Sequence, residues 1–340
     1  MAARIKDIAK RANVSEATVS LVLNQKPGVK NSTRERVLQI AREMNYGATQ
    51  RIALNTSAGT VRFLQIAMHG HTVNRDHNVF IADYIDGLTQ AAKTHGHKLE
   101  ISSFRGDTAA NIAGSILDSG IKGAVVLGTE LSIDDINTLG RLKIPVVFLD
   151  TYHDFLPFDF VDMNNKDSVY TIIEHLVDHG HREIGFVRSA VDTHNFQLRD
   201  TGFWEAVQAL DLDIKDRHVF TVDSTLDGAY RDMHEQILNR SKLPTALFCT
   251  NDIIAYGAIR AIREHNLQIP NDISIVAFDD LPASAVMVPP LTTIRVQKRV
   301  MGELAVQLLS RRIGNGADAP PTKIQVGGQL IVRSSVKKLA

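Results

Sequence analysis

The feature that most constrains the fold of this chain is an alternation, from residue 61 onward, of short and mainly apolar runs with amphipathic stretches. Runs of this kind are typical of parallel strands that helices cover on both faces. The runs are residues 63–67, 124–127, 146–149, 184–187, 246–248 and 273–278. The helical stretches between them include residues 80–93, 166–178, 196–210 and 253–264. The pattern predicts a doubly wound α/β body with parallel sheets, and its restart near Val161 predicts two similar lobes.

Polar residues follow three of the apolar runs. Asp150 and Asp279 each come directly after a run, and Asn251 follows a third. Ligands of parallel sheets bind at the carboxyl ends of the strands, so these side chains are candidates for one site. Carboxylates and amides beside an aromatic ring such as Phe80 suit a hydroxyl-rich ligand. Taken alone, each Asp is better explained as the N-cap of the next helix, and the convergence of three such strand ends shifts the balance toward a site.

The first 60 residues are basic, although the 340-residue chain has no net charge. They contain ten Lys and Arg against four Asp and Glu, a net charge of +6. The remaining residues hold 28 bases and 34 acids, a net charge of −6. This asymmetry predicts a polyanionic partner for the amino-terminal segment alone.

Three short helices are predicted within residues 5–45. The first covers residues 5–12, and the second covers about residues 16–24 after Ser15, which suits an N-cap. The third is predicted to open on a capping box formed by Ser32 and Glu35. The short connection between the first two helices favours a helix-turn-helix, which commonly binds DNA. A three-helix module that docks to another protein is the alternative, and the positive charge favours DNA.

Several classes of protein are excluded or lack support. The single cysteine, Cys249, cannot form an internal disulfide or a Cys-rich zinc site. No apolar run is long enough for a membrane span, and charged residues interrupt the first twelve positions. Nucleotide-binding and hydrolase motifs are absent, so we expect no catalytic residue, metal or cofactor. We interpret the histidines at 69, 71 and 77 as surface residues, of which His71 or His77 could edge a cleft. The chain is expected to be cytoplasmic.

Short motifs along the whole chain follow the order of one known family. In the amino-terminal segment they are Ile5–Ala9, Ala12–Ser15, Thr18–Ser20, Asn24, Thr33-Arg34 and Asn45-Tyr46. Further along they are His179–Phe186, Arg199 with Gly202-Phe203, Asn251-Asp252, Phe278–Asp280 and Pro290–Ile294. Together these motifs resemble the LacI/GalR family of bacterial repressors.

The resemblance implies a DNA-binding role for ten residues, the nine named here and Leu54 of the linker. Phosphate contacts, which fix the register of a protein on DNA, would come from Ser15, Thr18, Ser20, Asn24, Thr33 and Tyr46. The base-reading positions would be Glu16, Ala17 and Leu21. Glu16 could accept a hydrogen bond from cytosine, and the two apolar residues could contact thymine methyl groups. Alternatively, Glu16 only interacts with the helix dipole.

The linker departs from the family pattern. The family places a Pro two residues after the tyrosine and a Leu that inserts into the minor groove. Here Ala48 replaces the Pro, and Asn55 occupies the Leu position, with Leu54 one residue earlier. One residue rotates a helical side chain by about 100°. Either the hinge helix starts one residue earlier and Leu54 is the inserted residue, or this protein bends DNA differently, and we expect the first.

In the body, the resemblance implies two lobes similar to periplasmic sugar-binding proteins, joined by three crossing strands, with an effector between them. Carried over by position, Asp150, Arg199, Asn251 and Asp279 would bind the effector, and Phe80 would stack on it. Asp223 fills a position that is aromatic in the family, which argues for a polar ligand and against a purine.

The predicted domains are a helix-turn-helix domain (residues 1–45), a hinge (46–60) and an effector-binding and dimerisation core (61–340). Within the core, one lobe is expected at about 61–160 plus 293–324 and the other at about 161–290 plus 325–340. The predicted function is a homodimeric, effector-controlled repressor that binds a pseudo-palindromic operator, with a sugar or polyol as effector and no membrane partner. A sugar-binding module without DNA function and a carbohydrate-acting enzyme are the alternatives.

Overall fold

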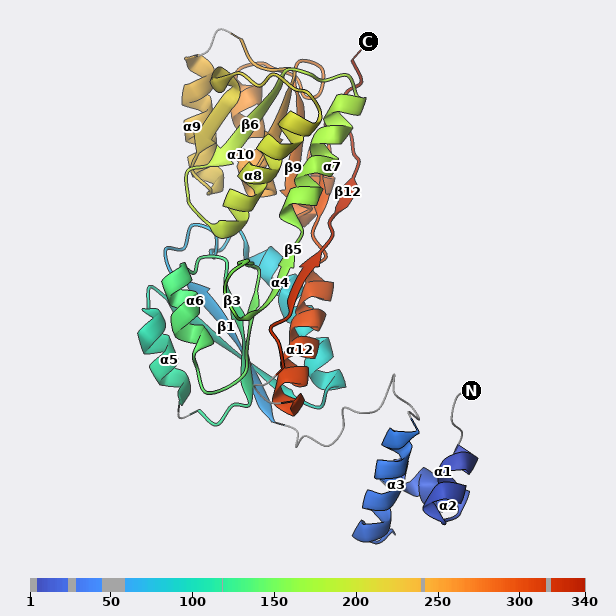
Figure 1. Cartoon of the computed structure of the whole chain (residues 1–340). Helices are drawn as coiled ribbons and strands as arrows, with labels where there is room; N and C mark the ends of the chain where they lie inside the picture. Colours follow the sequence, from blue (N-terminus) through green and yellow to red (C-terminus); the bar gives the residue numbers. More distant parts are fainter. Residues whose placement is uncertain are drawn as a thin grey trace. The chain divides into compact units, whose positions relative to one another are not determined.

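The computed structural model describes residues 5–23, 29–44, 59–117, 119–239, 242–315 and 319–339 (Figure 1). The chain divides into two compact units, Met1–Ser57 and Ala58–Ala340. Each unit has its own apolar core, and the two are described separately.

The amino-terminal unit is built from helices α1 (Ile5–Ala12), α2 (Glu16–Leu23) and α3 (Asn31–Glu43). Its core consists of small and branched apolar side chains spaced three or four residues apart on each helix: Ile8, Ala9, Ala12, Val19, Val22 and Val37. The first two helices agree with the sequence prediction. The third begins at Asn31, so Ser32 lies inside the first turn, and the predicted capping box at Ser32 is wrong.

The first lobe of the carboxy-terminal unit contains, among the described residues, one sheet of six parallel strands in the order β11-β5-β4-β3-β1-β2. The strands are β1 (Thr60–Ala67), β2 (Lys98–Arg105), β3 (Gly123–Leu127), β4 (Val146–Leu149), β5 (Asp159–Met163) and β11 (Lys323–Val326). Helices α4 (Asn78–Thr94) and α12 (Lys298–Asn315) cover one face of this sheet, and α5 (Ala109–Leu117) and α6 (Ile133–Gly140) cover the other (Figure 1).

The second lobe repeats this arrangement. Its sheet, within the described ranges, has six strands in the order β12-β10-β9-β8-β6-β7, and only the β10–β12 pairing is antiparallel. The strands are β6 (Ile184–Ser189), β7 (Val219–Val222), β8 (Ala246–Cys249), β9 (Ser274–Asp279), β10 (Thr292–Arg295) and β12 (Gln329–Ile331). The helices of this lobe are α7 (Asn165–Asp178), α8 (His194–Ala209), α9 (Leu226–Leu238), α10 (Asp252–Glu264) and α11 (Pro282–Val286), with a 3-10 turn at Asp216–His218. The predicted two-lobed, doubly wound α/β body is confirmed.

The chain passes between the lobes at three places: from β5 to α7, from β10 to α12, and from β11 to β12. At the third crossing Gly328 lies so close to neighbouring elements that a Cβ atom there would be 2.5 Å from Cγ2 of Ile294 and 2.7 Å from Oγ of Ser168. The close approach therefore requires a glycine at this position. The three crossings bring the carboxyl ends of the strands of both sheets toward one another.

Candidate functional site

Of the ten residues with an implied DNA contact, seven lie in described parts of the amino-terminal unit. Ser15, Glu16 and Ala17 are exposed, whereas Thr18, Ser20, Leu21 and Thr33 are partly buried. The predictions for Asn24, Tyr46 and Leu54 fall outside the described residues.

Helix α2 is fixed by its ends and by its inner face. Ser15 precedes the helix, and its Oγ accepts a hydrogen bond from the backbone N–H of Thr18 at 3.1 Å, as an N-cap does. Val19 and Val22 are buried in the core of the unit. Because the inner face is occupied, the first turn of α2, including Glu16, points to solvent.

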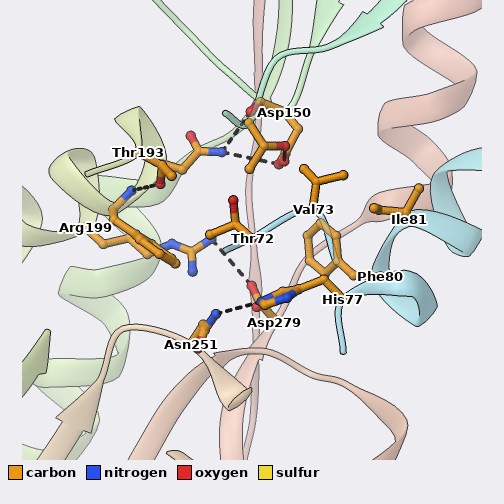
Figure 2. A pocket seen from close by; sticks show the side chains of 13 residues that line it. Thr72, Val73, His77, Phe80, Ile81, Asp150, Thr193, Arg199, Asn251 and Asp279 are labelled. Atoms are coloured by element: carbon orange, nitrogen blue, oxygen red, sulfur yellow. Dashed lines mark hydrogen bonds and ion pairs between the residues drawn. The ribbon is translucent and has the colours of Figure 1, made fainter. Parts of the chain in front are cut away.

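A pocket lies between the two lobes, and Figure 2 shows the side chains around it. Both lobes contribute lining residues. The five residues predicted to bind the effector all line it: Phe80, Asp150, Arg199, Asn251 and Asp279. The fold thus brings together side chains that are far apart in the sequence: Phe80 and Asp279 are separated by 199 positions.

The loop after β1 forms one wall of the pocket and is held by a single carboxylate. Glu130 accepts hydrogen bonds from the backbone N–H groups of His69, Gly70, Thr72 and Val73 and from the Thr72 hydroxyl, at 2.7–3.0 Å. Burial alone would raise the pKa of Glu130, but these backbone donors lower it to about 2. Glu130 therefore stays ionised and fixes Thr72 and Val73 at the pocket.

Asp150 lies at the end of β4 and is surrounded by donors. Its carboxylate accepts hydrogen bonds from Tyr84 Oη at 2.9 Å, from Asn195 Nδ2 at 3.2 Å, and from the Thr129 hydroxyl. Burial raises the pKa of Asp150 to about 6, against the effect of these donors. Asn195 belongs to α8 of the second lobe, so Asp150 links the two lobes.

Arg199 and Asp279 form a buried ion pair on the side of the second lobe. Nη2 of Arg199 is 3.4 Å from Oδ1 of Asp279, and the guanidinium lies over the Phe278 ring, 3.9 Å from its centroid. Further Arg199 donors bind Oδ1 of Asn165 and the carbonyl of Thr250, both at 2.9 Å. Burial raises the pKa of Asp279, and Arg199 partly offsets this shift.

The contacts of His77 with Asn251 and Asn74 determine which of its ring nitrogens carries the proton. Oδ1 of Asn251 accepts the backbone N–H of Ile254 at 2.9 Å, which leaves its Nδ2 to donate to Nε2 of His77 at 3.3 Å. Nδ1 of His77 lies 3.1 Å from Oδ1 of Asn74, an acceptor, and so carries the proton. Burial lowers the pKa of His77 to about 4, in agreement with a neutral ring.

The N-cap alternative applies to one of the three strand ends. Asn251 is the N-cap of α10. Asp150 and Asp279 cap no helix, and they adopt positive φ values of 65° and 120°. Residues other than glycine seldom adopt such φ values, and those that do are concentrated at functional sites. The backbone conformation of Asp150 and Asp279 therefore favours a role in the pocket over a role as helix caps.

The apolar side of the pocket is formed by Phe80 on α4. Its ring packs edge-to-face on Tyr84, with the centroids 5.3 Å apart. Nζ of Lys298, the first residue of α12, lies 4.8 Å from the Phe80 centroid and donates to the backbone carbonyl of Asp279 at 2.9 Å. Sequence reasoning missed Lys298 because it follows β10 and belongs to none of the motifs that defined the site.

Asp162 on β5 is a second residue that the sequence did not reveal. It is completely buried, and its Oδ1 has no hydrogen-bond partner among the described residues. Burial and the neighbouring Asp150 raise its pKa well above the ordinary value. The alternation of charged and apolar residues in this strand gave no signal that the carboxylate is enclosed.

Two sequence interpretations need correction. Asp223 does not line the pocket: its Oδ1 accepts from the backbone N–H and the hydroxyl of Thr225, so the argument from Asp223 about the ligand is not supported. His77 is 7% exposed, so it is not a surface residue, but it lines the pocket, in agreement with the expectation that it could edge a cleft. Within the described ranges, no group of three His, Cys, Asp or Glu side chains is arranged to hold a metal ion.

A helix-turn-helix unit followed by a two-lobed body with a ligand pocket defines the class of ligand-responsive DNA-binding regulators. The family model described as "Bacterial regulatory proteins, lacI family" matches residues 4–48, and the model of a periplasmic binding protein-like domain matches residues 173–336. The HTH-type transcriptional repressor PurR of Mannheimia succiniciproducens is 30% identical over 341 residues, which cover 99% of this chain and 100% of that protein. The chain belongs to the LacI family and is a DNA-binding transcriptional regulator, which confirms the sequence prediction.

Solved structures show the same fold. The lac repressor dimer bound to operator and the anti-inducer ONPF is 24% identical, with a TM-score of 0.71, and the match covers 99% of this chain and 100% of that one. The complex of the transcriptional regulator CelR with cellobiose is 23% identical, with a TM-score of 0.72, and the match covers 98% and 99%. In the part of the chain that the structure describes, every helix is too short or too polar to span a lipid bilayer.

Proposed function

We propose that this regulator is a homodimeric repressor whose affinity for operator DNA is controlled by a small hydroxyl-rich effector in the pocket between the lobes. The observation that carries the proposal is the convergence of Asp150, Arg199, Asn251 and Asp279 with Phe80 around one pocket. This combination of polar side chains and an aromatic face suits a sugar or polyol. The structurally similar regulator CelR was solved as a complex with cellobiose.

Contacts between the lobes give the effector a means of acting on the rest of the chain. Asn195 of the second lobe binds Asp150 of the first, and Asn251 binds His77. Oγ of Ser224 also donates to the carbonyl of His71 at 3.1 Å. A ligand that replaces any of these contacts changes the balance between closed and open lobes. Coupling of about 1–3 kcal/mol corresponds to a change of about 5- to 150-fold in operator affinity.

DNA binding is assigned to the amino-terminal unit. Ser15, Thr18, Ser20, Asn24, Thr33 and Tyr46 contact phosphates, Glu16, Ala17 and Leu21 face the bases, and Leu54 inserts into the minor groove. Two such units related by a two-fold axis read a pseudo-palindromic operator. Because base-reading positions hold no Arg, Gln or Asn, phosphate contacts and DNA deformation supply much of the affinity.

We further propose that the pocket binds its ligand without converting it, in the cytoplasm where the DNA is. Of the described residues that line it, His77 has both ring nitrogens engaged, and the hydroxyls of Thr72 and Thr129 donate to carboxylates. A hydroxyl or thiol nucleophile beside a free base, which acyl transfer requires, is not formed by these side chains.

The test is footprinting with the full-length protein on the promoter region beside its own gene, repeated with a panel of sugars. We expect a protected pseudo-palindrome, a steep loss of affinity with salt, and at least one sugar that changes protection at least 5-fold. Absence of any preferred fragment at low salt would contradict the proposed function. A bound sugar that is consumed would instead favour an enzyme.

A further inference from the structure

We propose that the effector carries no anionic group: the pocket accepts an uncharged or cationic hydroxyl-rich solute and rejects phosphorylated or carboxylated ones. This inference rests on the proposed function and specifies the charge of the effector. Most hydrogen-bond donors around the pocket are already bonded within the protein, whereas the acceptors have free capacity.

The donors around the pocket are largely engaged with the protein itself. Nδ2 of Asn195 donates to the carbonyl and the carboxylate of Asp150, and Nδ2 of Asn251 donates to His77. Nε and Nη1 of Arg199 bind Asn165 and Thr250, and Nη2 faces Asp279. The Thr193 hydroxyl, which accepts the N–H of Phe196, is a neutral donor at the pocket. A phosphate or carboxylate would have to displace buried contacts before it could pair with the guanidinium of Arg199, and such displacement is unfavourable.

The acceptors, by contrast, have free capacity. The Asp279 carboxylate receives no hydrogen bond in the described structure other than the 3.4 Å approach of Arg199. The Asp150 carboxylate accepts from three side chains, Tyr84, Thr129 and Asn195, of the roughly four lone-pair sites available. Figure 2 shows these two carboxylates on opposite sides of the pocket. A ligand that spans them must donate hydrogen bonds, as hydroxyl and ammonium groups do.

The charges around the pocket lead to the same conclusion. The guanidinium of Arg199 is already paired with the buried carboxylate of Asp279, and the buried Asp150 lies on the other side of the pocket. Lys298, the other buried cation, binds the carbonyl of Asp279, and its Nζ lies 3.7 Å from Oδ2 of Asp83.

An added anion would therefore face carboxylates across a poorly solvated space in which the described residues offer no free cation. Like charges that are brought together in a buried site repel strongly. His77 provides no compensation, because its ring is neutral and both nitrogens are engaged. Phe80 supplies the apolar face on which the non-polar side of a sugar ring packs.

The experiment is isothermal titration calorimetry of the full-length protein at neutral pH with matched sets of probes. One set is glucose, glucosamine, glucose 6-phosphate and gluconate, another is ribose and ribose 5-phosphate, and a third is cellobiose and cellobionate. We expect binding by uncharged or cationic members, with each anionic counterpart at least 100-fold weaker. An anionic member that binds equally well or better overturns the inference and leaves the proposed function intact. No binding by any probe also overturns it. Loss of operator binding, measured on the same preparation, is the separate outcome that contradicts the proposed function.

A variant tests the cause of the selection. Asp279→Asn keeps the size of the side chain and one acceptor but removes the negative charge, so it should reduce the discrimination against the anionic probe at least 10-fold. Asp227→Asn is the control, because this side chain on α9 is 86% exposed and lies outside the pocket, and it should leave the ratio unchanged. Equal ratios in Asp279→Asn and wild type overturn the inference. The comparison of matched probes on the wild-type protein decides the question even where the variant does not fold.

Discussion

The imidazole ring of His153 stacks on that of His194, with the ring centroids 4.1 Å apart and the planes 22° from parallel. His153 follows β4 in the first lobe, and His194 is the first residue of α8 in the second lobe. The pair is therefore a direct contact between the lobes. Two rings at this distance stack favourably only while at most one of them is charged.

Acid should weaken the closed arrangement of the lobes. Burial, followed by the nearby His194 and Lys323, lowers the pKa of His153 from 6.5 to about 4. When the lobes separate, the ring regains an ordinary pKa and binds a proton between these two values. The contribution of His153 to closure is thus present above about pH 6.5 and is lost as the pH falls toward 4. Asp154 opposes the shift only partly, and Nζ of Lys323 donates to the His153 carbonyl at 2.6 Å.

The measurement is the thermal unfolding midpoint at a series of pH values from 7.5 to 4.5. Between pH 6.5 and 4.5, the midpoint of His153→Phe, which keeps a stacked ring, should fall less or rise more than that of the wild type. His77, whose pKa is also lowered to about 4, contributes in the same direction as His153 in both proteins, and the buried carboxyls of Asp150 and Asp252, whose pKa values burial raises to about 6 and about 7, contribute in the opposite direction in both. His95→Gln, at the end of α4, is the control and should behave as wild type. An unchanged pH profile in His153→Phe would show that the stack does not titrate.

Replacement of Arg199 should separate effector response from DNA binding. Arg199→Ala leaves buried Asp279 without its partner, so we expect a loss of about 3–5 kcal/mol in the free energy of unfolding and no effector response. Arg199→Lys keeps the charge without the planar fork and should retain more stability, with effector affinity at least 10-fold weaker. Operator binding without effector should persist in Arg199→Lys. Arg188→Ala, on the exposed side of β6, is the control, and parallel loss of operator and effector binding in Arg199→Lys would contradict the division of roles.

Glu130 should determine the order of the loop that follows β1. Glu130→Gln places an amide among N–H donors and breaks two or more hydrogen bonds to a charged acceptor, so the free energy of unfolding should fall by about 2–4 kcal/mol. The folded pKa of Glu130, about 2, lies below its ordinary value. Its contribution is therefore present above about pH 4.5 and is lost as the pH falls toward 2, and Glu130→Gln should flatten acid unfolding in this range. Urea unfolding of the variant measures the first effect, and Glu235→Gln, which removes an exposed carboxylate of α9, should match wild type.

The central strands were predictable because their burial is complete. Every residue of β3 and β8 is buried, and a continuous apolar run signals such a strand. The edge strands were not found. In β2, exposed and partly exposed residues alternate, and the strand pairs on one side only, so its sequence resembles an exposed segment. Edge strands therefore carry too little apolar signal to be recognised without their neighbours.

The site was predictable to the extent that strand ends defined it. Asp150, Asn251 and Asp279 follow apolar runs, and a parallel sheet brings such ends to one edge. The protonation of His77 and the enclosure of Asp162 could not be inferred, because both depend on contacts between residues far apart in sequence. Nδ2 of Asn251, which fixes the tautomer of His77, is 174 positions away along the chain.

Two glycines of α12 should respond in opposite directions to the same substitution. Gly302 packs against α4, where a Cβ atom would lie 2.5 Å from the carbonyl oxygen of Tyr84, and backbone atoms cannot move aside cheaply. Gly302→Ala should therefore destabilise the body by about 1–3 kcal/mol, through overpacking, and should displace Lys298 and Phe80 enough to weaken effector binding. Gly314 lies in the same helix with no atom within 4 Å of an added Cβ. Gly314→Ala should stabilise by about 0.4–1 kcal/mol, because it restricts the unfolded chain without a clash. Urea unfolding of the two variants measures the difference, and equal effects would mean that α12 does not pack on α4 through Gly302.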